Sequence, residues 1–106
     1  MKYLPLFLLV LCSAGYVNAA DAPAPHAGFH MEASALMEKM SVDMKTMKAT
    51  GNPDKDFATM MISHHQGAVD MSEAYLKFGK DEDLKKMASK MMEDQKKEIQ
   101  MMKAKL

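Results

Sequence analysis

The stretch that decides the fold of this chain is Asp56-Phe-Ala-Thr-Met-Met-Ile-Ser-His-His-Gln-Gly-Ala-Val-Asp-Met71. Its apolar residues recur at intervals of four and three, the spacing that places side chains on one face of an α-helix. Continued beyond the stretch, the recurring positions are Phe57, Met61, His64, Ala68, Met71, Tyr75 and Phe78. The spacing predicts a long amphipathic helix with His64 in the middle of its apolar stripe and His65 directly after it.

Two further helices are predicted, one on each side of this stretch. The first spans about Phe29 to Thr50, where Ala33, Met37, Met40, Met44 and Met47 repeat at helical spacing. Gly51 suits the position after a helix end, and Asn52-Pro53 suits the cap and first turn of the next helix.

The central helix is predicted to run to about Phe78 and to stop at Gly79, and Asp81 is the predicted cap of a third helix that continues to the C-terminus. We therefore expect an all-α fold, an antiparallel bundle of three long helices. A second copy could supply the helices that a four-helix bundle lacks.

The N-terminal region has the features of an export signal. Lys2 supplies a positive charge, Leu4 to Leu11 form an apolar run, and small residues precede Ala20. We expect residues 1–20 to be a cleaved signal peptide, 21–28 a flexible Pro/Ala tether and 29–106 the helical domain. Cys12, the only cysteine, would leave with the signal, so the exported chain would have no disulfide. The apolar run would leave with it too, so no stable membrane insertion is expected after cleavage. The periplasm is the expected location.

The composition argues against nucleic-acid binding, and its unusual feature is a high content of methionine. The chain has 14 basic and 14 acidic residues, and every basic residue is lysine, so no basic surface for nucleic acid is expected. Of its 14 methionines only Met1 belongs to the signal. Leucine, the usual core residue of helices, is rare after residue 20.

Matching residues by height across antiparallel hairpins predicts which side chains meet. A turn near residue 52 places His64 level with Met40, and a turn near residue 80 places His64 and His65 level with Lys96 and Gln95. Within about one helical turn, one layer would then hold Met40, Met44, Met60, Met61, His64, His65, Gln95, Glu98 and Met102.

This layer combines the ligands that copper prefers. Thioether sulfur is soft and favours Cu(I), and imidazole binds both copper oxidation states. Gln95 or Glu98 could orient an imidazole without binding the metal. A methionine stripe is also a common way to fill a helical core, and a buried histidine is often held by a polar neighbour, so the residues alone leave both interpretations open. His64 is the preferred ligand, because His65 lies on a flanking stripe with Ile62 and Val69. His26, His30 and Met31 could form a looser accessory site.

Other site types lack their motifs. There is no Glu-x-x-His pair for a di-iron bundle, no His-Glu-x-x-His for a zinc hydrolase, no nucleophile motif and no phosphate-binding glycine loop. We expect no enzymatic activity.

Three segments together resemble a known family: Thr50-Gly-Asn-Pro-Asp-Lys-Asp-Phe57, Met60-Met-Ile-Ser-His-His-Gln-Gly-Ala68 with Met71, and Gln95-Lys-Lys-Glu-Ile99 with Met102. This pattern is similar to family 305 of the domains of unknown function, whose better-understood members are CopM-type periplasmic copper-binding proteins. The resemblance implies a ferritin-like helical bundle, copper binding for tolerance or delivery, and a functional position for Met71.

The sequence thus favours an exported Cu(I) metallochaperone or scavenger that exchanges copper with other periplasmic copper-handling proteins. Two alternatives stay open. One is a methionine-rich sink for oxidants; the other is a metal-free bundle whose methionine core serves homodimerisation.

Overall fold

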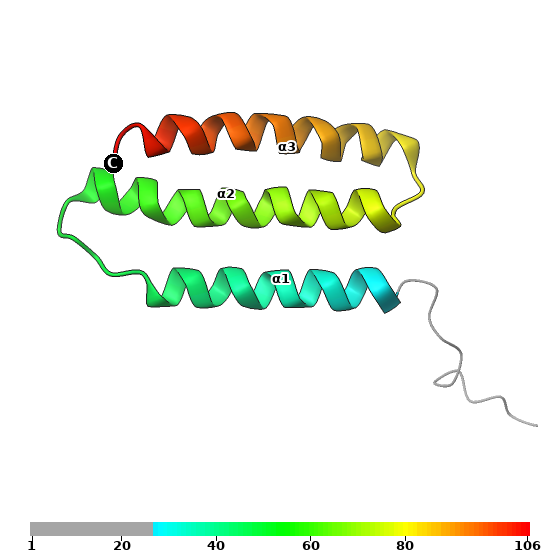
Figure 1. The fold of residues 1–106 in the computed structure, drawn as a ribbon, viewed down its shortest axis with the longest axis horizontal. Helices are drawn as coiled ribbons and strands as arrows, with labels where there is room; N and C mark the ends of the chain where they lie inside the picture. The colour runs from blue at the N-terminus through cyan, green and yellow to red at the C-terminus, as the bar shows by residue number, and fades with distance from the viewer. Residues whose placement is uncertain (1–26) are drawn as a thin grey trace, which may run out of the picture.

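The computed structural model describes residues 27–106 and contains three helices, α1 (Ala27–Thr46), α2 (Pro53–Phe78) and α3 (Glu82–Lys103). Consecutive helices run antiparallel (Figure 1). The predicted all-α antiparallel helical fold is confirmed. The predicted signal peptide, most of the tether and His26 lie outside the described residues.

The three helices form a single layer with α2 in the middle (Figure 1). α2 contacts α1 on one side and α3 on the other, whereas α1 and α3 do not contact each other. A closed bundle would surround a common core, but a single layer leaves two broad faces. None of the described helices combines the length and the apolar character needed to cross a membrane.

The starts of α2 and α3 follow the predicted capping rules. The Asn52 side chain accepts hydrogen bonds from the backbone N–H groups of Asp54 and Lys55, and Pro53 occupies the first turn. The Asp81 carboxylate accepts from the Leu84 N–H at 2.9 Å. Each side chain satisfies a backbone donor that the helix itself leaves free.

The end of α1 differs from the prediction. The helix stops at Thr46 and not near Thr50, so Gly51 does not close it, although Gly51 does adopt the left-handed φ of 84°. The Asp56 carboxylate accepts hydrogen bonds from the Thr50 N–H, the Thr50 hydroxyl and the Gly51 N–H. These bonds hold residues 50 and 51 against the first turn of α2 instead of letting them continue α1.

The interface between α2 and α3 contains most of the buried side chains. Ala58, Val69 and Ser72 are buried and lie on one side of α2, and Ala88 and Ile99 are buried on α3. These side chains are small apart from Val69 and Ile99, so the two helices are held by a narrow seam.

Glycines allow close packing between α1 and α2. A Cβ atom at Gly67 would lie 2.6 Å from Met40 Sδ, and one at Gly28 would lie 2.7 Å from the Phe78 ring. The Phe29 ring meets the Tyr75 ring edge-on, with centroids 6.3 Å apart. α1 therefore packs on the side of α2 that carries Gly67, away from the seam with α3.

The two faces of the layer have opposite character. On one face, ion pairs join Lys77 to Glu32 of α1 and Lys96 of α3 to Glu73. The other, which we call the open face, carries apolar residues from α2 and α3. These are Phe57, Met61, Ala68, Met71, Tyr75, Leu84, Met87, Met91 and Met101.

Candidate metal site

Two helices bring methionine, histidine and glutamate together at one end of the open face. A groove between the first half of α2 and the last turns of α3 has a volume of about 250 Å³. Its lining comprises Phe57, Met61, His65, Glu98, Met101 and Met102. Of the residues predicted for the site, Met61, His65, Glu98 and Met102 are therefore adjacent in the structure.

His65 is the best positioned imidazole of this cluster. Its side chain is only 12% exposed, and its Nε2 lies 2.6 Å from Glu98 Oε2. Glu98 is 56% exposed, so it reaches the imidazole from the solvent side. With Nε2 donating to Glu98, Nδ1 carries the ring's lone pair; it is buried without a hydrogen-bond partner.

Gln95 does not orient either histidine by a hydrogen bond. Its Oε1 is buried without a hydrogen-bond partner, and it is Glu98 that holds His65. His65 was predicted to lie level with Gln95 but pairs with Glu98, three residues further along α3, which is within one helical turn of the prediction. Of the two candidate orienting residues, the structure selects Glu98.

The preference for His64 over His65 was wrong in its structural premise. His64 is exposed, and His65 lies with the buried residues of the seam. The reason is that α2 has a neighbour on each side, so the centre of its apolar stripe faces neither of them. The two rings remain close, with centroids 6.1 Å apart, so His64 borders the cluster from the surface.

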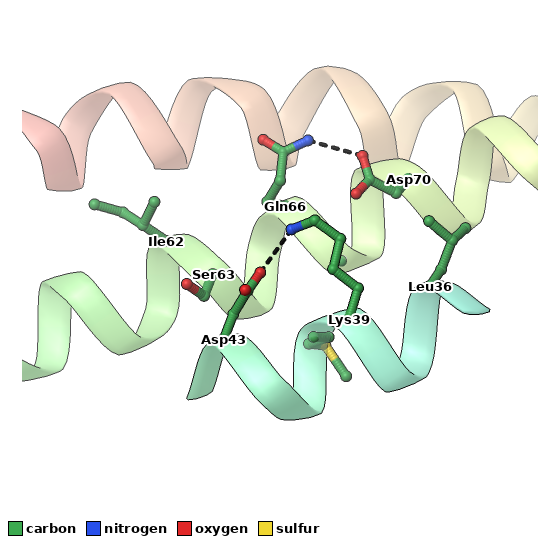
Figure 2. A pocket seen from close by; sticks show the side chains of 9 residues that line it. Leu36, Lys39, Asp43, Ile62, Ser63, Gln66 and Asp70 are labelled. Atoms are coloured by element: carbon green, nitrogen blue, oxygen red, sulfur yellow. Dashed lines mark hydrogen bonds and ion pairs between the residues drawn. The ribbon is translucent and has the colours of Figure 1, made fainter. Parts of the chain in front are cut away.

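Met40 and Met44 belong to α1, which has no contact with α3. Met40 packs against Gly67 and lines a different groove, between α1 and α2 (Figure 2). There Lys39 pairs with Asp43 at 2.6 Å, and the Gln66 amide donates to Asp70 at 2.9 Å. Lys39 and Asp43 of α1 thus pair with each other, as do Gln66 and Asp70 of α2, and Met40 lies in this groove and not in the cluster.

The other predicted residues lie outside the cluster. Met60 is 40% exposed, and Met71 lines a second apolar groove of about 360 Å³ with Tyr75 and part of α3. His30 is exposed and Met31 is 72% exposed, so neither is held in a formed accessory site.

Sequence reasoning missed one methionine of the cluster, Met101. It lies three residues after Glu98 and directly before Met102, and lines the same groove. The i, i+3 spacing from Glu98 was the available signal. It was overlooked because the predicted layer took only Gln95, Glu98 and Met102 from the third helix.

The cluster depends on sulfur. Within residues 27–106, no three side chains among His, Cys, Asp and Glu gather as a group that could hold a metal ion. The further candidate ligands beside His65 in this groove are the thioethers of Met61, Met101 and Met102. That donor set fits a soft, low-charge cation better than Zn²⁺ or Mg²⁺.

The sequence matches a family model over nearly its whole length. The model, described as a domain of unknown function (DUF305), covers residues 13–106. The chain is a DUF305 protein. The match includes every residue that the structure describes, and so both helices of the cluster. No curated protein matches the sequence of this DUF305 protein.

Proposed function

We propose that this DUF305 protein is an exported copper-binding protein of the CopM type that carries or sequesters Cu(I). The observation that supports the proposal best is the convergence of Met61, His65 and Met102 on one groove of the open face. Copper is here the cargo, and the role needs no catalytic step.

The chemistry of the cluster suits this cargo. Thioether sulfur has no acid–base reaction in the accessible pH range, so methionine ligands do not compete with protons for Cu(I). Glu98 fixes the His65 ring through Nε2 and leaves the lone pair of Nδ1 free to bind the metal. In a single copy the groove is open to solvent along one side, which would let copper enter and leave.

The cellular setting is also part of the proposal. An N-terminal signal would deliver the chain to the periplasm, and its cleavage would remove Cys12, the only cysteine. The exported protein could then bind copper without forming disulfides. Copper tolerance, or delivery to other periplasmic copper-handling proteins, follows from such a location.

The test is an anaerobic titration of Cu(I) against a competing chelator. We expect His65→Ala, Met61→Leu and Met102→Leu each to weaken binding by at least about tenfold. The matched controls are His30→Ala and Met31→Leu, which alter exposed residues of the same types on α1 and should not change the affinity. Unchanged affinity in all three cluster variants would contradict the proposed site.

His64→Ala separates the two histidines. Because His64 borders the cluster from the surface, its loss should weaken Cu(I) binding less than the loss of His65. A larger effect at His64 would place the metal on the open face, outside the groove.

A second candidate function, a sacrificial oxidant sink, is favoured by the exposure of several methionines. Met31, Met37, Met87 and Met101 are 72%, 58%, 59% and 69% exposed. Such a sink should oxidise at these residues before the half-buried Met40 and Met44. Mass spectrometry after limited hypochlorous acid treatment would show the order. Protection that survives in a variant lacking both His64 and His65 would favour this function over copper binding.

A further inference from the structure

Most of the apolar surface of the open face lies outside the proposed copper site. Beyond the cluster it continues over the second half of α2 and the first half of α3 as an apolar groove of about 360 Å³. Its lining is Ala68, Met71, Ser72, Tyr75, Leu84, Met87, Ala88 and Met91. No acidic or basic side chain belongs to this part of the face.

The buried core of one layer is small, and the larger apolar side chains of the open face lie outside it. Among residues 27–106 the buried apolar residues are Ala58, Val69, Ala74, Ala88 and Ile99, three of them alanines. By contrast, the exposed apolar residues on the open face are large: Phe57 is 62% exposed, Leu84 49%, Met87 59% and Met91 43%. A domain of this size needs most of its large apolar side chains in the core.

The stripe on α2 is nearly symmetric about Ala68, its smallest residue. Met61 and Tyr75 each lie seven residues from Ala68, and the other two pairs differ by one residue. These are His64 four before and Met71 three after, and Phe57 eleven before and Phe78 ten after. Two copies of α2 can therefore cross at Ala68 with like-sized residues on both arms. Such a self-complementary surface is what a two-fold axis requires.

The size and charge of the face also fit a second copy. Three helices of 20, 26 and 22 residues, at a rise of about 1.5 Å per residue and a spacing of about 9 Å, give the whole layer a footprint of roughly 900 Å². α2 and α3, which carry the apolar residues, supply about 650 Å² of it. A stable interface needs about 800 Å² per partner. The interhelix ion pairs of Glu32 and Glu73 lie on the other face, so two open faces can meet without burying them. Among the residues that line the two grooves of the open face, Glu98 at one end is the one acidic or basic side chain.

We infer that the open face is the interface of a homodimer, in which α2 of one copy crosses α2 of the other at Ala68. The dimer is a two-layer helical assembly whose shared core comes from the methionines and aromatic residues of both copies. The inference does not use copper binding, but Phe57, Met61 and Met101 of the copper groove lie on the same face, so its test is performed on metal-free protein.

The experiment is sedimentation equilibrium on the wild type and two charge variants. We expect the wild type to be a dimer at micromolar concentration. Ala68→Glu places two carboxylates at the crossing point and should raise the dimer dissociation constant by at least about 100-fold. Thr59→Glu introduces the same residue on the polar face of α2 and should leave the dimer intact. A monomeric wild type throughout the micromolar range, or equal effects of the two variants, overturns the inference.

Cysteine cross-linking covers the case in which Ala68→Glu fails to fold. In a Cys12→Ser background, Ala68→Cys should form a disulfide-linked dimer under mild oxidation, because the crossing brings the two copies of residue 68 within disulfide reach. The control is Thr59→Cys. Cross-linking at residue 59 as fast as at residue 68 means that the copies do not meet through the open face.

Discussion

Replacing His65 by leucine should separate a binding role from a structural role. If the imidazole is present for the metal and not for the fold, its removal should stabilise the metal-free protein. Leucine is apolar and of similar size, so it can fill the space beside Met61 and Met102 without adding a polar atom to the seam between α2 and α3.

The magnitude follows from two opposing terms. The buried Nδ1 of His65 has no hydrogen-bond partner, and an unsatisfied buried polar group costs about 1–3 kcal/mol. The contact with Glu98 is lost, but that carboxylate is 56% exposed, so the pair contributes only about 0.5–1 kcal/mol. His65→Leu should therefore stabilise the metal-free protein by about 1 kcal/mol. In a domain of this size that raises Tm by about 4–8 °C.

The assay is thermal or urea unfolding followed by circular dichroism, in chelator and then with Cu(I). His30→Leu is the matched control, since the same substitution at an exposed histidine of α1 should stay within about 0.5 kcal/mol of wild type. With Cu(I) present, wild type should gain stability and His65→Leu should not. Destabilisation of the metal-free His65→Leu variant by more than about 1 kcal/mol would refute the reasoning, because the His65–Glu98 pair would then support the fold itself.

Three further predictions concern the fold. Ile99→Ala should cost about 2–5 kcal/mol in urea unfolding, because Ile99 is only 4% exposed in the seam. Met31→Leu, at a 72% exposed site on α1, should change stability by less than about 0.5 kcal/mol. Equal losses would mean that the seam is not where the helices are held together. Asn52→Ala should cost about 1 kcal/mol, since it removes the acceptor for two backbone N–H groups of α2, and an unchanged urea midpoint would contradict this cap. Hydrogen bonds from Thr50 lower the pKa of Asp56 below its ordinary value of 3.8. The stability that these bonds give to the folded protein is therefore present above that pH and is lost as the pH falls through the lowered pKa. Asp56→Asn should accordingly be less stable than wild type at pH 7, with the difference narrowing below about pH 4; a difference that persists at pH 2 would argue against the carboxylate as the cause.

Local rules were sufficient wherever a feature depends on neighbours in the chain. The start of α2 at Pro53 and its end at Phe78 were predicted correctly, because Asn52 and Gly79 act within a few residues of the boundary. The end of α1 was not, since Thr50 and Gly51 are held by Asp56 from the next helix. That contact competes with helix propensity and has no signature in the sequence of the first helix.

The sequence by itself determined three amphipathic helices, their antiparallel order and a zone rich in methionine and histidine, since periodicity and capping are properties of a single helix. Only the tertiary structure decided which histidine joins which methionines. A stripe on one helix identifies an apolar face but not the direction from which a neighbour packs, and α2 has a neighbour on each side. α3 packs on the side that carries His65, brings Glu98 and Met102 to it, and leaves His64 on the open face.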